Sequence, residues 1–236
     1  MNKGAFAVII PVYNHYEQVA HVIEEALKLD MPVFVVDDGS TDSTRNVIQA
    51  IPGITIIHHD KNRGKGAALM TGFLAAAPVA AWAITIDADG QHNPKDVLHL
   101  MEAIPEGQRP IVVGKREGMS SPDIPWKSRF GRKFSNFWVW ISGGPDIEDS
   151  QSGMRIYPLP EAIDLRVKAK RFQFEVEILV KAHWKKYPVI EAPISVSYKP
   201  GLKRVSHFHP FVDFLRNSCT FTRLVTLRIM LHLFLK

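Results

Sequence analysis

The sequence predicts an α/β fold with a mostly parallel central sheet, followed by a basic, apolar helical appendage. Short runs rich in Val and Ile alternate with helical patterns over the first 115 residues, which is typical of repeated strand–helix units. Polar residues follow these runs, where parallel sheets bind ligands. A separate excess of basic charge begins after residue 198.

The predicted strands and helices alternate along the chain. Residues 5–12 form a continuous apolar run, which is typical of a strand buried on both faces. Apolar side chains at helical spacing indicate a helix over 17–29. The other predicted strands are at 33–36, 54–57, 82–86, 111–113, 154–157 and 189–198, and the other helices at 43–50, 67–76, 94–104, 124–142 and 174–184. No internal repeat or low-complexity linker interrupts them, so we expect one domain over 1–198 and a basic helical segment over 199–236.

Composition limits the class of protein. A chain of 236 residues can bury a full core, and 46% apolar with 22% charged residues excludes a disordered or fibrous chain. The single cysteine, Cys219, excludes an intramolecular disulfide and a zinc site built from several thiolates, and favours a reduced, cytoplasmic compartment. No secretory signal is visible, and the apolar run over 75–86 is too short to span a bilayer.

Basic charge is concentrated in two segments. Residues 1–198 have a net charge of −1, whereas 199–236 contain seven Lys and Arg against one Asp, a net charge of +6. A second excess lies over 115–133. Basic patches attract phosphates on lipids, nucleic acids or soluble substrates. Because no interleaved aromatic RNA-binding pattern accompanies the charge, nucleic acid is not an expected partner.

Two carboxylates leave the predicted fourth strand together. Asp87 and Asp89 are two residues apart, and their mutual repulsion is unfavourable unless a cation compensates it. Oxygen ligands of this kind suit Mg²⁺ or Mn²⁺. By spacing alone, a solvated turn that caps the next helix is an equally good interpretation.

Two further motifs follow the second and third strands. Asp37 and Asp38 either cap the next helix or accept hydrogen bonds from a nucleobase or ribose. The loop 62–66, with Arg63 and Lys65, resembles a phosphate-approaching loop that opens a helix. It lacks the Walker and G-x-G-x-x-G spacings, which argues against a P-loop nucleotidase or a dinucleotide oxidoreductase.

Asp149 lies in a polar loop after the predicted helix over 124–142. It is a candidate general base that deprotonates an attacking hydroxyl. The alternatives are that it orients Arg155 or only solvates the loop.

Four motifs together resemble those of family 2 glycosyltransferases, most closely the dolichyl- and polyprenyl-phosphate sugar transferase branch. They are VIIPVYN at 8–14, VVDDGSTD at 35–42, NRGKG at 62–66 and DADGQH at 87–92, in the family's order and spacing. The likeness covers about residues 5–198. It implies a Rossmann-like GT-A fold that binds a nucleotide-sugar, with Mg²⁺ or Mn²⁺ held by the Asp-x-Asp motif.

The resemblance also implies a role for each matching residue. The nucleotide-sugar would contact Pro11, Tyr13, Asn14, Asp37, Asp38 and Asp87. The metal would be held by Asp87, Asp89 and Gln91, and Arg63 or Lys65 would stabilise the departing diphosphate. The acceptor phosphate would be bound by Arg116, Arg129, Arg132 and Ser135.

The implied reaction is an inverting transfer to a membrane-borne acceptor. A polyprenyl or dolichyl phosphate is already anionic and needs no general base, whereas a hydroxyl of a glycolipid or saccharide would need Asp149. An alternative of another class is an inactive membrane-binding module that keeps only the nucleotide-sugar fold.

The C-terminus departs from the many relatives that append transmembrane helices. The chain ends in the segment 211–236, whose last 16 residues include ten apolar side chains but are interrupted by Arg223, Arg228 and His232. One interpretation is an interfacial helix with snorkelling arginines, which would make the protein peripheral at the cytoplasmic face of the membrane. The other is a helix packed against the domain or a second subunit.

Overall fold

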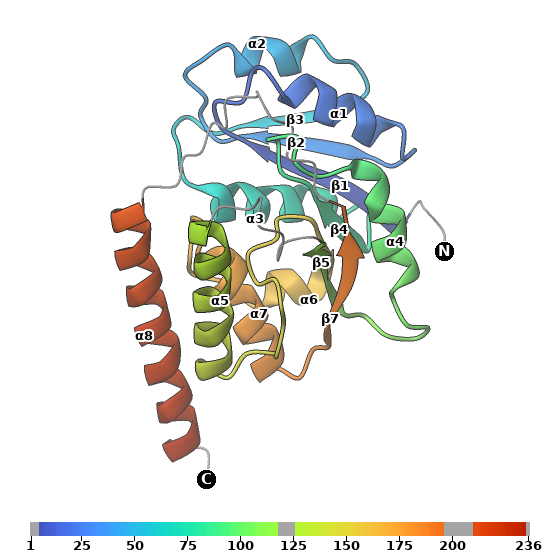
Figure 1. Cartoon of the computed structure of the whole chain (residues 1–236). Helices are drawn as coiled ribbons and strands as arrows, with labels where there is room; N and C mark the ends of the chain where they lie inside the picture. Colours follow the sequence, from blue (N-terminus) through green and yellow to red (C-terminus); the bar gives the residue numbers. More distant parts are fainter. Residues whose placement is uncertain (1–4, 118–125, 196–209, 235–236) are drawn as a thin grey trace.

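The computed structural model describes residues 5–117, 126–195 and 210–234, with side chains at 5–117, 131–195 and 218–230. This part of the chain contains a seven-stranded sheet in the order β3-β2-β1-β4-β6-β5-β7 (Figure 1). The strands are β1 (Phe6–Val12), β2 (Val33–Asp37), β3 (Thr55–His58), β4 (Trp82–Thr85), β5 (Ile111–Arg116), β6 (Arg155–Pro158) and β7 (Val189–Ile194). Since β6 alone runs antiparallel to its neighbours, the prediction of a mostly parallel α/β sheet is confirmed.

Helices cover both faces of this sheet (Figure 1). In β1, Val8 and Ile10 face one layer and Ala7 and Ile9 the other, all fully buried. Each fully buried aliphatic side chain of this size contributes about 1.5–3 kcal/mol. A Cβ on Gly72 would lie 2.4 Å from Ile9 Cγ2, so glycine lets α3 approach β1 closely. The first layer contains α1 (Val19–Leu27), α2 (Thr44–Gln49) and α4 (Val97–Glu102), and the second contains α3 (Lys65–Ala76), α6 (Leu159–Asp164) and α7 (Phe174–Trp184).

The structure differs from the predicted elements in three main respects. Strand β5 continues to Arg116 rather than ending at residue 113, because β7 pairs with it in parallel as far as Ile194. The helix predicted over 94–104 begins as a 3₁₀ turn, η2 (Pro94–Asp96), where Asn93 Oδ1 accepts a hydrogen bond from Lys95 N at 3.1 Å. Helix α6 was not predicted, because six residues are too few to show a period. A proline in its first turn is the signal that marks its start.

Helices α5 (Trp126–Ile141) and α8 (Pro210–Phe234) lie side by side (Figure 1). Phe221 and Leu224 of α8 are buried in a cluster with Val139 of α5 and Val180 of α7. The Trp138 and Phe221 rings stack with centroids 5.6 Å apart. The described part of α8 therefore packs against the domain, as one of the two interpretations predicted.

Two arginines of α8 also bind the domain. Arg223 pairs with Glu177 of α7, and Arg228 Nη1 donates to the Ile141 carbonyl at 2.7 Å. The interpretation that these two arginines snorkel to a membrane is therefore wrong. No helix in the described part of the chain combines the length and apolar character that a membrane crossing requires. The predicted boundary at 198/199 lies outside the described residues.

Candidate active site

The polar motifs converge at the carboxyl edge of the sheet. Strands β1, β2 and β4 are parallel, and β4 and β5 both run antiparallel to β6. Asn14, Asp38, Asp87 and Arg116 thus lie at the same edge. The strand order changes direction between β1 and β4, the place where open α/β sheets bind ligands.

Lys65, Asp87 and Glu175 form a compact charged cluster at this edge. Lys65 Nζ, in the first turn of α3, lies 2.6 Å from Asp87 Oδ1 and 2.5 Å from Glu175 Oε1. Burial opposes the charge on Lys65, but the two carboxylates outweigh burial and raise its pKa above the ordinary value. Burial would raise the pKa of Asp87, yet the nearby Lys65 ammonium lowers it overall. At Glu175 burial dominates and raises the pKa.

The Asp87 carboxylate rests on the backbone of the polar loop that precedes β6. A Cβ on Gly153 would lie 2.0 Å from Asp87 Oδ2, so any larger residue there would displace the carboxylate. The loop is tied to β4 by a hydrogen bond that Thr85 Oγ1 donates to the Gly153 carbonyl at 2.8 Å. The position of Asp87 thus depends on a residue far away in the sequence.

The predicted metal ligands Asp87, Asp89 and Gln91 offer two carboxylates and an amide, and these oxygen ligands fit a hard divalent cation. Asp89 has no ion-pair partner among the described residues, and its Oδ1 accepts a hydrogen bond from Gln91 N at 3.1 Å. The neighbouring His92 is buried, and its Nδ1 has no hydrogen-bond partner in the part of the chain that the structure describes. The described residues contain no group of three His, Cys, Asp or Glu side chains that could hold a metal. Carboxylates and an amide suit Mg²⁺ or Mn²⁺, which commonly complete their shells with water and substrate phosphate.

Asn14 joins the end of β1 to the loop after β2. Its backbone N donates to Ser40 Oγ at 3.0 Å, and its Oδ1 accepts from Thr41 N at 2.8 Å. The carboxylate of Asp37 is buried, accepts from Ser40 N at 2.9 Å and pairs with Arg45 Nε at 3.2 Å. Both side chains thus shape the loop predicted to hold the nucleotide. Pro11 is buried and Tyr13 half-buried next to it.

Asp38 holds the loop 62–66. Its Oδ1 accepts from Arg63 N at 2.9 Å, its Oδ2 accepts from Gly64 N at 2.7 Å, and His59 Nδ1 lies 2.7 Å from Oδ1. The side chain of Arg63 is exposed, and Lys65 follows at the start of α3. The structure thus brings together two predicted motifs, with Asp38 buried beneath the loop.

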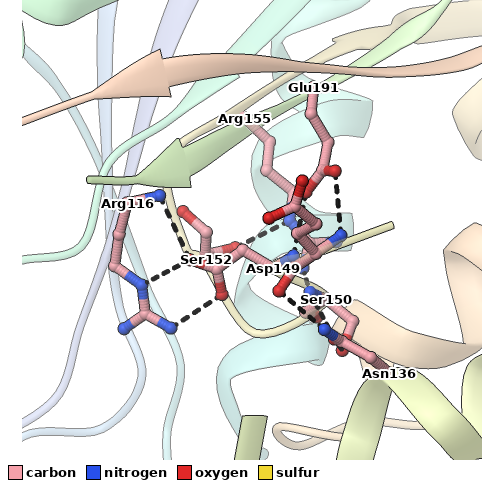
Figure 2. Close-up of polar contacts among 8 residues, drawn as sticks. Arg116, Asn136, Asp149, Ser150, Ser152, Arg155 and Glu191 are labelled. Carbon is pink, nitrogen blue, oxygen red and sulfur yellow. Dashed lines mark hydrogen bonds and ion pairs between the residues drawn. The ribbon is translucent and has the colours of Figure 1, made fainter. Parts of the chain in front are cut away.

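Arg116 and Asp149 form the second charged cluster (Figure 2). Arg116 Nε donates to Asp149 Oδ2 at 2.7 Å, and Nη2 donates to Oδ1 at 2.8 Å. Glu191 of β7 accepts from the backbone N of Glu148 and of Asp149, each at 2.8 Å, and so holds the loop. Asp149 therefore orients Arg116.

Arg155 is buried beneath the same loop (Figure 2). Its guanidinium donates to the carbonyls of Ser150, Ser152 and Glu175, at 2.8, 2.7 and 2.9 Å. The interpretation that Asp149 orients Arg155 is therefore wrong, because backbone carbonyls fill that role.

The α5 residues predicted to bind the acceptor differ in exposure. Ser135 is buried, and its Oγ lies 2.9 Å from the Ser150 Oγ that donates to it. Arg132 is half-buried, and its Nε has no hydrogen-bond partner among the described residues. Arg129 belongs to α5, but its side chain lies outside the described residues.

Three residues contribute to the site without having been predicted there: Gly153, Glu175 and Glu191. Each touches a predicted residue only through a contact distant in sequence. The sequence around each of these three residues does not predict such a contact.

Residues 7–158 match the family described as "Glycosyl transferase family 2". The chain belongs to this family. This family 2 glycosyltransferase is 28% identical over 215 residues to the UDP-N-acetylglucosamine–dolichyl-phosphate N-acetylglucosaminyltransferase of Methanococcus voltae, covering 81% of this chain and 85% of the relative. It is 27% identical over 213 residues to the polyprenol monophosphomannose synthase of Mycolicibacterium smegmatis, covering 84% and 80%.

The fold of this family 2 glycosyltransferase is also similar to a solved structure. Mannosyl-3-phosphoglycerate synthase from Rubrobacter xylanophilus matches with a TM-score of 0.63 and 16% identity, over 97% of this chain and 74% of the other. The predicted GT-A class and the resemblance to the dolichyl- and polyprenyl-phosphate branch are therefore confirmed.

Proposed function

We propose that this family 2 glycosyltransferase is a metal-dependent inverting enzyme that moves a sugar from a nucleotide-sugar to a membrane-borne polyprenyl or dolichyl phosphate. The names of its relatives support this acceptor class. The observation that carries the choice of acceptor is the buried Asp149 carboxylate, whose two oxygens both bind Arg116.

The donor binds at the edge formed by β1, β2 and β4 in this proposal. Asn14 and Asp37 shape the nucleotide loop, and Asp38 holds the loop that carries Arg63. Arg63 and Lys65 stabilise the nucleoside diphosphate as it leaves, because negative charge grows there when the glycosidic bond breaks. When held by Asp87, Asp89 and Gln91, Mg²⁺ or Mn²⁺ supplies further positive charge to the same diphosphate.

The acceptor binds at Arg116. A phosphate monoester oxygen attacks the anomeric carbon from the face opposite the departing diphosphate, which inverts the configuration. No proton has to be removed, so a general base is unnecessary. A hydroxyl acceptor would need Asp149 as that base, and the bidentate pair disfavours this role because the Arg116 guanidinium already occupies both carboxylate oxygens. Arg129 and Arg132, both on α5, are the further acceptor-binding residues that the family resemblance implies.

The outer faces of α5 and α8 contact the membrane in this proposal. Phe137 and Trp140 of α5 are 52% and 58% exposed, and Ile229 and Met230 of α8 are 54% and 49% exposed. Grouped exposed apolar side chains mark interaction surfaces, and the acceptor is itself a membrane lipid. Where its side chains are described, over 218–230, α8 thus has an inner face for the domain and an outer face for lipid.

A donor screen followed by a transfer assay tests the proposal. Thermal shift with UDP- and GDP-sugars should reveal at least one donor that stabilises the protein only with Mn²⁺ or Mg²⁺. That donor should then glycosylate polyprenyl phosphate in vesicles, and NMR of the product should show the inverted anomeric configuration. A product formed only on a hydroxyl acceptor would overturn the choice of acceptor. The absence of any donor effect would indicate an inactive module.

A further inference from the structure

The buried carboxylate of Glu177 joins three segments of the chain. Its Oε1 accepts from Lys168 N and its Oε2 from Ala169 N, both at 3.0 Å, and Lys181 Nζ lies 3.0 Å from Oε1. Arg223 of α8 also forms an ion pair with Glu177, through its Nη2 and the Glu177 Oε2. The Glu177 side chain is 1% exposed, so its charge depends on these partners.

The segment held by Glu177 supports the donor loop. The Lys170 carbonyl accepts a hydrogen bond from Ala67 N, in the first turn of α3, at 2.9 Å, and shares this donor with the Gly64 carbonyl, also at 2.9 Å. A Cβ on Gly64 would lie 2.5 Å from the Lys170 carbonyl oxygen, and one on Gly66 2.9 Å from the Ala169 carbonyl oxygen. Residues 168–170 are thus in tight contact with the turn that presents Lys65 to Asp87.

We propose that Arg223 is a positioning residue for the donor site, an inference that rests on the proposed function. Arg223 neutralises Glu177, Glu177 fixes the backbone at 168–169, and that backbone supports the turn around Lys65. Seating of α8 on the domain therefore determines how well Lys65 and Asp87 are aligned for the diphosphate. An α8 that faces the membrane would in this way couple membrane docking to donor binding.

The matched pair Arg223→Gln and Arg228→Gln tests this coupling in the full-length protein. Both arginines lie on α8 and bind the domain, but Arg228 contacts the end of α5 and the turn after it, through the Ile141 carbonyl and Gly143. Isothermal titration with the donor found in the screen gives donor affinity. Hydrogen exchange of the Ala67 amide in ligand-free protein reports how well the turn is held, because the Lys170 carbonyl is one of the two acceptors of that amide.

We expect Arg223→Gln to weaken donor affinity about tenfold and to speed Ala67 exchange by a similar factor, as for local opening. Arg223→Lys should restore most of the donor affinity and most of the protection of the Ala67 amide from exchange. Arg228→Gln should lower the melting temperature but change neither readout. Equal effects of both Gln variants on donor affinity, or unchanged Ala67 exchange in Arg223→Gln, would overturn the coupling. If the wild-type protein bound no nucleotide-sugar, the proposed function would fail, while Ala67 exchange would still test the coupling.

Discussion

The guanidinium of Arg116 is held by the carboxylate of Asp149 through two hydrogen bonds, of 2.7 and 2.8 Å. Asp149 is fully buried, and Arg116 N also donates to its Oδ2, at 3.2 Å. A bidentate pair of this kind fixes the plane of the guanidinium as well as its position. Arg116 is thereby set rigidly at the end of β5.

Asp149→Asn should impair acceptor binding more than catalysis. Loss of one partner of a buried pair costs about 3–5 kcal/mol of stability and leaves Arg116 free to turn. We expect the acceptor KM to rise about tenfold or more, with donor affinity unchanged. Steady-state kinetics at varied acceptor concentration measures this. A fall in kcat of two or more decades at constant acceptor KM would instead identify Asp149 as a general base.

Asp87→Asn and Asp89→Asn should change the unfolding free energy of the ligand-free protein by different amounts. Asp87 is the partner of Lys65, so its loss should cost about 1.5–3 kcal/mol of unfolding free energy. Asp89 has no ion pair among the described residues, so Asp89→Asn should leave that free energy nearly unchanged. Both variants should lose the cation-dependent thermal shift with donor. An Asp89→Asn protein that retained this shift would contradict the proposed metal site.

Gly153→Ala should disrupt the site, whereas Gly131→Ala should not. The new Cβ at residue 153 would lie 2.0 Å from Asp87 Oδ2 and must displace that carboxylate. At Gly131, in helix α5, a Cβ would meet nothing within 4 Å, so alanine should add about 0.5–1 kcal/mol of stability. Donor titration and chemical denaturation of both variants check this. Wild-type donor affinity in Gly153→Ala would refute the close contact.

Ile229→Ser with Met230→Ser should weaken binding to vesicles of anionic lipid without unfolding the protein. These side chains are exposed, whereas deletion of α8 would uncover the buried cluster around Val139 and Val180. Each lost apolar contact should reduce membrane affinity several-fold. Val79→Ser, at a position 57% exposed after α3, is the control. Equal sedimentation of wild type, double variant and control would argue against the α8 surface.

The stability provided by Asp37 should depend on pH. Burial would raise its pKa, but the Ser40 hydrogen bonds and the contacts with His58 and Arg45 lower it overall below the ordinary 3.8. The ionised carboxylate therefore stabilises the fold above the unfolded pKa, and this contribution is lost as pH falls through the folded pKa. Asp37→Asn should melt below wild type near pH 7, and the difference should shrink towards about pH 3. A difference constant across this range would show that another cause dominates.

Much of the architecture was predictable because it follows from the pattern of apolar and polar residues over short stretches of the sequence. The apolar runs of β1 and β2 and the period of α1 identify the elements, and their alternation identifies a parallel sheet. The polar motifs at the strand ends indicated the site for the same reason. Local spacing failed at α6, which has too few residues for a period, and at the end of β5, which is extended by pairing with β7.

The sequence by itself determined the fold class, the family resemblance and the edge of the sheet where charged residues gather, since each depends on residue types at short spacings. Only the tertiary structure decided which charges meet. Lys65 pairs with Glu175 across 110 residues of chain, Asp149 with Arg116 across 33, and α8 docks on α5 and α7 through Phe221 and Arg223. Such pairings follow from how buried faces pack and how buried charges find partners, and no local pattern encodes them.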